Sequence, residues 1–285
     1  MLKLSQTLDF GKFVNPKHKA MGIASRNVIT CTENERIRSL INIMLGLGIP
    51  GRGGYRRIPV IDKRDNSLRG IVTTTDMLDF LGAGPKYELF VLRSGLDSKV
   101  RKIMTPDVHS LDKNNSIANA LNTFKKNRRG AYPILHENRV LGILSEHNLI
   151  KQINKKTGIK VGDLMVKKPM IAKEEQPVLD IARMMCRGGF RRLPVVSNGI
   201  LTGIVTPYDI LNNLSRNNKL SKLKYETRPI KDIMNVGVAS VNPEADIYRA
   251  IDIMHRKRIG GLPVTVEDEL IGIITERDIV DTLHL

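Results

Sequence analysis

The sequence predicts an α/β protein made of four copies of one β-α-β-β-α unit. Two blocks of residues recur four times each, and a helical apolar stripe precedes each pair of blocks. The first block surrounds a proline and occurs as Tyr55-Arg-Arg-Ile-Pro-Val60, Gly130-Ala-Tyr-Pro-Ile134, Phe190-Arg-Arg-Leu-Pro-Val195 and Ile259-Gly-Gly-Leu-Pro-Val264. The second block occurs as Gly70-Ile-Val-Thr-Thr-Thr-Asp76, Gly142-Ile-Leu-Ser-Glu-His-Asn148, Gly203-Ile-Val-Thr-Pro-Tyr-Asp209 and Gly272-Ile-Ile-Thr-Glu-Arg-Asp278. The proline lies 11 residues before the glycine in the first copy and 9 in the other three, a spacing that chance does not produce.

Each copy should begin with a short strand and an amphipathic helix. We expect the first strands at Val28-Ile29, Val108 to Leu111, Met170 to Ala172 and Val238 to Val241. After a polar turn, apolar residues recur at three- and four-residue steps, which is the pattern of a helix with one buried face. This stripe consists of Ile37, Leu40, Ile41 and Met44 in the first copy, and of Ile247, Ala250, Ile251 and Met254 in the fourth.

The two blocks should form a strand pair and a second helix. We expect the proline block to be a strand with its proline at the start, because proline cannot donate a ladder hydrogen bond. Polar turns such as 62–67 and 197–199 separate it from the glycine block, which should be the next strand. The Thr or Ser three residues after the glycine should then open the second helix.

One unit alone has too little helical cover for its sheet, so the units should pair. We expect an N-terminal segment at 1–20 and a first pair at 21–155, with repeats at 21–82 and 98–155. The second pair should span 156–285, with repeats at 156–214 and 228–285. The run Gly82-Ala-Gly-Pro85 and the asparagine-rich stretch 212–218 indicate the linkers inside the pairs.

Composition favours a cytoplasmic protein with anionic partners. No apolar run approaches the ~18 residues that a membrane span needs, and the N-terminus lacks the apolar stretch of a signal peptide. A net charge of +17 favours nucleotides, nucleic acid or an acidic protein surface. Cys31 and Cys186 stand among apolar residues, which predicts buried thiols, and no cluster of histidine or cysteine indicates a metal site.

The repeated blocks resemble the CBS domain, and two such domains in tandem resemble a Bateman module. Four in one chain are similar to the γ subunit of AMP-activated protein kinase and its stand-alone archaeal counterparts. The resemblance covers residues 21–285 and implies two Bateman modules. Arginine pairs in repeats 1 and 3, alternating with glycines in repeats 2 and 4, fit two modules packed as a disc.

An adenine nucleotide requires an acceptor for its ribose diol, cations for its phosphates and an apolar slot for its base. The CBS resemblance assigns the ribose hydroxyls to Asp76, Asp209 and Asp278. It implies that nearby hydroxyl side chains approach the ribose or phosphate: Thr73, Thr75, Thr206 and Thr275. The alternative is purely structural, because Thr-x-x-Asp at a helix start is a capping box that contributes about 1 kcal/mol.

Arginine pairs beside two of the prolines indicate phosphate binding. Arg56-Arg57 and Arg191-Arg192 are adjacent like charges, which a multivalent anion would justify because guanidinium groups match phosphate oxygens. The alternative is a pair of solvated arginines at a strand edge. The resemblance places the base slot at the apolar residues around three prolines: Ile58, Pro59, Val60, Leu193, Pro194, Val195, Leu262, Pro263 and Val264.

Two features depart from the pattern. Asn148 replaces the aspartate in repeat 2, so we do not expect strong nucleotide binding there. Gly46-Leu-Gly-Ile-Pro-Gly51 matches GxGxxG, but it follows a helix instead of a strand and therefore fails as a dinucleotide loop. It belongs to a Gly-rich insertion at 46–54 that includes Arg52, and it is either a plain surface loop or a cover over a ligand or partner.

The expected function is an energy sensor that binds AMP, ADP or ATP as a regulatory ligand, without a cofactor, and acts on a protein target. Alternatives are another adenosine derivative such as S-adenosylmethionine, or nucleic acid, which the charge favours but the 4% aromatic content and the lack of Trp do not. No nucleophile–base pair, metal cluster or acid dyad indicates an enzyme. A homodimer is compatible with the sequence, and no membrane partner is expected.

Overall fold

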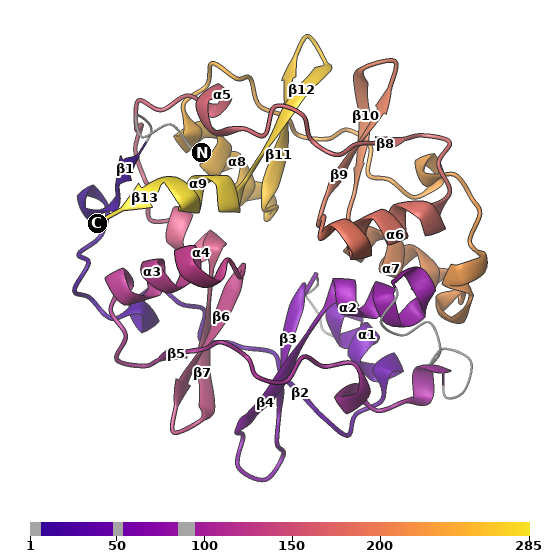
Figure 1. The fold of residues 1–285 in the computed structure, drawn as a ribbon, viewed down its shortest axis with the longest axis horizontal. Helices are drawn as coiled ribbons and strands as arrows, with labels where there is room; N and C mark the ends of the chain where they lie inside the picture. Colours follow the sequence, from indigo (N-terminus) through magenta and orange to yellow (C-terminus); the bar gives the residue numbers. More distant parts are fainter. Residues whose placement is uncertain (1–6, 48–53, 85–94) are drawn as a thin grey trace. The chain divides into compact units, whose positions relative to one another are not determined.

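The four repeats fold alike in a computed structural model that describes residues 7–47, 54–84 and 95–285 (Figure 1). Repeat 1 contains β2 (Cys31–Thr32), α1 (Ile37–Leu45), β3 (Arg57–Ile61), β4 (Leu68–Thr73) and α2 (Thr74–Leu78). Repeat 2 contains β5 (Leu111–Asp112), α3 (Ile117–Asn127), β6 (Ala131–His136), β7 (Arg139–Ser145) and α4 (Glu146–Ile150). Repeat 3 contains β8 (Ala172–Lys173), α6 (Val178–Gly188), β9 (Leu193–Ser197), β10 (Ile200–Val205) and α7 (Pro207–Arg216). Repeat 4 contains α8 (Ile247–Lys257), β11 (Gly261–Val266), β12 (Glu269–Thr275) and α9 (Glu276–Thr282). The predicted α/β class is confirmed.

The apolar stripes form the buried faces of the first helices, as predicted. In α1 all four stripe residues are 0% exposed, and in α8 none is more than 3% exposed. Gly46 follows α1 with φ 71°, a left-handed conformation that glycine adopts without steric cost. The insertion after α1 lies largely outside the described residues, including Arg52 and most of the GxGxxG match.

The first strands begin later than the sequence indicates, and proline explains why. Their parallel pairing with the proline strand starts one residue after the proline in every repeat: Cys31 with Val60, Leu111 with Ile134, Ala172 with Val195 and Val241 with Val264. Proline has no N–H for this neighbour, so the ladder cannot extend across it. The first strands are therefore two residues long, and repeat 4 has only an isolated bridge.

Each repeat is preceded by a segment that pairs with the sheet of its sister repeat. These segments contain the short helices η2 (Ala20–Gly22), η5 (Val100–Lys102), α5 (Val161–Leu164) and η7 (Ile230–Asp232). The bridges join Ser25 to Ile143, Thr105 to Ile71, Val166 to Ile273 and Asn235 to Ile204. Repeats 1 and 2 thus exchange segments, as do repeats 3 and 4, which is the pairing expected of two Bateman modules.

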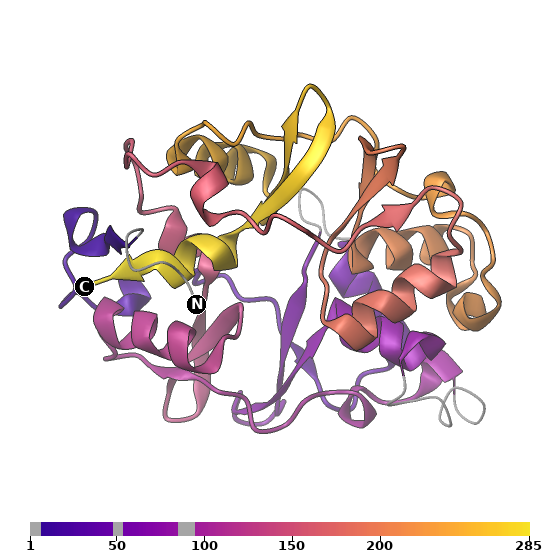
Figure 2. The same ribbon diagram turned by 45° about the horizontal axis from the view of Figure 1, so that its top comes forward.

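The start and end of the described chain are paired. Strand β1 (Leu8–Asp9) lies parallel to β13 (Leu283–His284), with Leu8 opposite Leu283. Figure 2 shows the β11–β12 hairpin, in yellow, leading into α9 and β13. Phe10, directly after β1, is 0% exposed and belongs to the core of repeats 2 and 4.

The chain forms two compact units, and each unit draws on both modules. One consists of Met1–Val28, His109–Pro169 and Ala239–Leu285, and its core joins repeats 2 and 4. The other consists of Ile29–Val108 and Met170–Val238, and its core joins repeats 1 and 3. Helices α4 and α9 pack together in the first unit, and α2 and α7 in the second. The expected disc and the expected domain boundaries stay predictions.

Candidate functional site

A capping box connects the glycine strand to the second helix in every repeat. In repeat 1 the backbone N–H of Thr73 donates to Asp76 Oδ2 at 2.8 Å, and the Thr73 hydroxyl donates to the same oxygen at 2.7 Å. In return, the Asp76 N–H donates to Thr73 Oγ1 at 3.2 Å. The structural alternative raised by the sequence is therefore present as a capping box, and a binding role would have to come in addition to it.

The carboxylates of Asp76 and Asp209 keep one oxygen available for a ligand. Thr206 binds Asp209 Oδ2 at 2.8 and 2.6 Å, as Thr73 binds Asp76, and among the described residues no donor meets Oδ1 of either aspartate. Thr275 binds Asp278 Oδ2 at 2.7 Å in the same way. All three aspartates are half-buried, so their carboxylates lie at the surface of a repeat and not in its core.

Repeat 2 retains the cap without the carboxylate. Ser145 binds Asn148 Oδ1 at 2.9 Å through its N–H and at 2.7 Å through its hydroxyl. The Asn148 amide nitrogen donates to Ser25 Oγ at 3.4 Å, where an aspartate would present an acceptor. Asparagine thus accepts the same capping hydrogen bonds at the start of the helix. Capping alone therefore does not require the aspartates of the other repeats.

The arginine pairs lie next to the caps of repeats 1 and 3. Arg57 is the cross-strand partner of Thr73, and the Thr74 N–H donates to the Arg56 carbonyl at 3.1 Å. In repeat 3 Leu193 pairs with Val205, which puts Arg192 beside the cap at the equivalent position. Ala131 and Gly261 face the caps of repeats 2 and 4. Arg57 and Arg192 are half-buried, whereas Arg56 and Arg191 are exposed.

The residues predicted for the base slot are buried in the cores. The side chains of Ile58, Val60, Leu193, Val195, Leu262 and Val264 are 0% exposed, and the three prolines between them are also buried. Their contact with a base stays a prediction, and in the present structure these side chains belong to the apolar cores of their own units.

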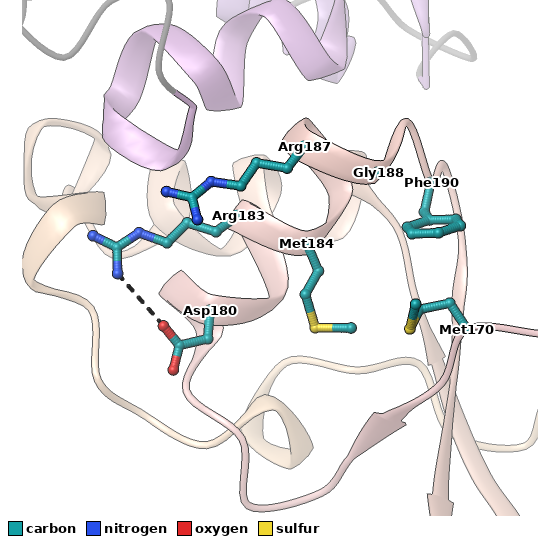
Figure 3. A pocket seen from close by; sticks show the side chains of 7 residues that line it. All are labelled: Met170, Asp180, Arg183, Met184, Arg187, Gly188 and Phe190. Carbon is teal, nitrogen blue, oxygen red and sulfur yellow. Dashed lines mark ion pairs between the residues drawn. The ribbon is translucent and has the colours of Figure 1, made fainter.

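A cavity of about 450 Å³ in repeat 3 is lined by residues of α6, by Phe190 in the loop after it and by Met170 before β8 (Figure 3). Phe190 and Met170 lie one above the other at one end, the guanidinium groups of Arg183 and Arg187 lie at the other, and Met184 is between them. The Phe190 ring packs against Gly188, where a Cβ would come within 2.1 Å of it. An ion pair of 3.6 Å joins Arg183 to Asp180.

This cavity combines an apolar, partly aromatic end with a basic end, which suits an aromatic anion. From the sequence, Met170 and Phe190 were expected only as parts of strands, and Arg183 and Arg187 were not predicted to bind a ligand. Their spacing was the available signal, because Arg183 and Arg187 are four residues apart and therefore share one face of α6.

Neither cysteine has the chemistry of a nucleophile. Burial raises the pKa of the Cys31 thiol to about 12, with Glu35 adding to the shift. Burial also raises the pKa of Cys186 to about 12, and the carboxylates of Asp79 and Asp76 act in the same direction. The Cys186 Sγ lies 3.9 Å from the carbonyl oxygen of Thr75, a half-buried residue in the first turn of α2. Both thiols therefore stay protonated at neutral pH.

The described residues offer neither a metal site nor a membrane-spanning helix. In this part of the chain no three His, Cys, Asp or Glu side chains gather as metal ligands. Among the same residues, no helix is long and apolar enough to cross a bilayer. The cytoplasmic location stays a prediction.

The family model described as "CBS domain" matches the chain four times, at residues 20–83, 100–155, 161–216 and 230–285. Protein MJ1225 of Methanocaldococcus jannaschii is 31% identical over 281 residues, which is 92% of this chain and 98% of that protein. A 33.4-kDa protein from a ribosomal RNA operon of Thermofilum pendens is 29% identical over 247 residues, or 82% of each chain.

Solved structures agree with these matches. The crystal structure of MJ1225, described as a candidate archaeal homologue of the AMP-activated protein kinase γ subunit, has a TM-score of 0.83 at 29% identity. The match covers 92% of this chain and 98% of that one. A Pyrococcus horikoshii protein shares the fold at 20% identity with a TM-score of 0.58, covering 92% and 98%.

Proposed function

Because the chain belongs to the CBS-domain family and carries four copies of the domain, we propose that it is a regulatory protein that binds adenine nucleotides. AMP, ADP or ATP would bind at the caps, and the liganded state would be passed to a protein target. The archaeal homologue of the kinase γ subunit, similar over nearly the whole chain, supports this role. No catalytic step is part of the proposal.

The observation that carries the proposal is the open carboxylate oxygen beside an arginine pair. In repeats 1 and 3 a half-buried aspartate presents Oδ1 at a cap whose neighbouring strand carries an arginine pair, with Arg57 the cross-strand partner of Thr73 and Arg192 directly before Leu193, which pairs with Val205. A carboxylate suits a ribose diol, and guanidinium groups suit a phosphate. Repeat 3 adds the cavity between Phe190 and Arg187. We therefore expect repeat 3 to bind most tightly and repeat 2 not to bind.

Asp209→Asn tests the ribose role with the cap preserved, because Asn148 makes the same capping hydrogen bonds in repeat 2. We expect the calorimetric affinity for AMP, ADP or ATP to fall about tenfold or more, since a charged hydrogen bond is worth about 1.5–3 kcal/mol. The melting temperature should stay near that of the parent. Asp209→Ala is the matched variant that also loses the two hydrogen bonds from Thr206 to Asp209 Oδ2, at a cost of about 0.5–1.5 kcal/mol each.

The ligands tested by calorimetry should include S-adenosylmethionine. This compound would bind more tightly than the nucleotides if the arginines do not bind phosphate. Unchanged nucleotide affinity in Asp209→Asn would remove the aspartate from the site. A protein that binds no adenosine compound at millimolar concentration would refute the proposed function altogether.

Nucleic-acid binding is the second candidate, and the net charge of +17 is the observation that favours it. A gel shift with duplex DNA and single-stranded RNA tests this candidate. If the protein binds nucleic acid, the binding should weaken steeply between about 50 and 200 mM salt.

A further inference from the structure

The last turn of each first helix contacts the start of a second helix from the other repeat of its unit. The contacted residue is always the second residue of that helix, directly before the aspartate or asparagine of the cap. These contacts join Leu45 to Tyr208 at 3.4 Å, Cys186 to Thr75 at 3.9 Å, His255 to His147 at 3.3 Å and Phe124 to Arg277 at 3.0 Å. Each candidate ribose site therefore adjoins a helix end that another repeat supplies.

At the cap of repeat 4 this contact fixes the backbone of Arg129, which lies two residues after the end of α3. Arg277, directly before Asp278, donates from Nη2 to the Arg129 carbonyl oxygen at 2.9 Å. On its other side, the Arg129 N–H donates to the hydroxyl of Tyr132 at 3.1 Å, and Tyr132 is 0% exposed. Arg129 is thus anchored both by the core of repeat 2 and by the turn that carries the aspartate of repeat 4.

The second helices of the two repeats also touch each other at this point. Helices α4 and α9 pack together, and His147 Nδ1 lies 2.9 Å from Glu276 Oε1. The Arg277 side chain is only 13% exposed, so it is nearly enclosed at the contact. The backbone of Arg129 is therefore held in place before a ligand arrives, which favours affinity because less freedom is lost on binding.

The guanidinium group of Arg129 remains available to a ligand. The residue is exposed, and in the parts of the chain that the structure describes no carboxylate or carbonyl group accepts a hydrogen bond from its side chain. Its neighbour Arg128 differs, because that guanidinium group pairs with Asp281 at 2.9 Å. Arg277 is likewise engaged, since it donates to the carbonyl groups of Phe124 and Arg129. Of these three arginines, Arg129 is therefore the one that can bind an anion.

Repeat 4 needs a cation from elsewhere, because glycines stand where arginines flank the caps of repeats 1 and 3. The arginine pair of repeat 3 is replaced by Gly260-Gly261 in repeat 4. A phosphate beside the carboxylate of Asp278 would be repelled unless a positive charge lay nearby. Four residues before the proline the repeats carry Tyr55, Arg129, Phe190 and Ile259, so only repeat 2 has a cation there. The charge that the repeat 4 strand lacks is thus present at the helix end that repeat 2 places against the same cap.

We propose that Arg129 of repeat 2 binds the phosphate of a nucleotide whose ribose is held by Asp278 of repeat 4. This inference rests on the proposed function and extends one of its sites across two repeats. The Arg129 backbone contacts the residue next to Asp278, so its side chain begins within reach of a phosphate on a ribose bound there. Repeat 2, whose Asn148 disfavours a nucleotide of its own, then contributes to binding in the neighbouring site.

A structural role is the alternative, because positive charge at the C-terminal end of a helix stabilises that helix. Lys125, Lys126 and Arg128 already supply such charge at the end of α3. An arginine that only stabilised the helix would affect the melting temperature and not the preference for phosphorylated ligands. The two roles therefore predict different measurements.

The double variant Asp76→Asn with Asp209→Asn leaves Asp278 as the remaining aspartate of the three, and its caps are preserved because asparagine caps the helix of repeat 2. Adding Arg129→Gln should lower the calorimetric affinity for ADP about tenfold or more, the usual effect of losing a charged hydrogen bond. The affinity for adenosine, which has no phosphate, should not change. The melting temperature should also stay the same, because Arg277 binds the backbone carbonyl of Arg129, which every substitution retains.

Two further variants in the same background separate the charge from its position. Arg129→Lys should recover part of the ADP affinity, since lysine keeps the charge but not the paired donors of arginine. Arg139→Gln is the matched control, because it removes an equal charge from an exposed residue at the tip of the β6–β7 hairpin, the end away from the cap. Its ADP affinity should stay close to that of the double variant.

Equal losses of ADP affinity in Arg129→Gln and Arg139→Gln would overturn the inference, as would equal losses for ADP and adenosine in Arg129→Gln. A double variant that bound no ADP would also overturn it, because repeat 4 would then hold no site. If the unmodified protein bound no adenosine compound at all, the proposed function itself would fail.

Discussion

At the scale of single residues, Asn148 separates two roles that the three aspartates combine. It caps its helix with distances close to those of Asp76, but it offers amide donors where the aspartate offers an oxygen. Thr-x-x-Asp alone is ambiguous between a cap and a ribose ligand, and the natural asparagine shows that the cap tolerates the neutral residue. The capping hydrogen bonds alone therefore do not require the aspartates, and their ribose role stays a prediction.

Gly70 is required by the exchange of segments between sister repeats. A Cβ on this residue would lie 2.8 Å from the Thr105 carbonyl oxygen and 2.9 Å from the Met104 sulfur. We expect Gly70→Ala to destabilise the protein by about 1–3 kcal/mol, the usual cost of overpacking, measured by urea denaturation. Gly22→Ala is the control, because nothing lies within 4 Å of its Cβ position. Equal stability of the two variants would contradict the close approach.

Asp62 makes stability depend on acid pH. Hydrogen bonds from the Arg64 side chain, the Arg64 N–H and Arg69 hold the pKa of this carboxyl well below its usual range. A lowered folded-state pKa contributes stability above the unfolded value, near 4, and that stability is lost as pH falls. Asp62→Asn should therefore be less stable than the parent at pH 6, and the gap should narrow toward pH 2.

Denaturant midpoints measured across this range check the effect. Asp97→Asn is the matched control, because its partner Arg36 is 68% exposed and such a surface pair contributes little. A gap for Asp62→Asn that does not change with pH would rule out the carboxylate as its source.

At the scale of elements, the N-terminal strand belongs to the core of repeats 2 and 4. Phe10 is fully buried directly after β1, which pairs with β13 at the far end of the chain. Phe10→Ala should cost about 3–5 kcal/mol, and it should speed amide hydrogen exchange in β13. Phe13→Ala, at a half-buried position, should cost less. Normal protection of β13 in Phe10→Ala would mean that the strand pair does not depend on this core contact.

The elements also show what a sequence can reveal. The helices were predicted well because their apolar period is local, whereas the first strands were placed too early because the missing proline N–H acts on a neighbouring strand. The exchanged segments were missed although a signal existed: an aliphatic residue, two variable residues, Ile or Leu, and Met recur at Val100–Met104, Val161–Met165 and Ile230–Met234. The pair of His147 and Glu276 joins residues 129 apart, which no local pattern reveals.

At the scale of the whole molecule, a net charge of +17 should act on every anionic ligand. Added salt screens such attraction, with a Debye length of about 8 Å at 0.15 M. We expect calorimetric affinity to fall between 50 and 500 mM salt (~10-fold change in ionic strength), more for ATP than for AMP, whereas uncharged adenosine should be nearly unaffected. An equal loss of affinity for ATP, AMP and adenosine would mean that the basic side chains do not bind the phosphate groups.

The exchange of leading segments limits which part of the chain can stand alone. A single repeat cut out with its leading segment would lack the segment that pairs with its own glycine strand. Its own leading segment would also lack the sister strand with which it pairs. Both pairings could form only in a dimer of identical repeats, in which the leading segment of each copy pairs with the glycine strand of the other. An ancestor with one repeat would therefore be a dimer, and fusing two such genes would make its assembly independent of concentration.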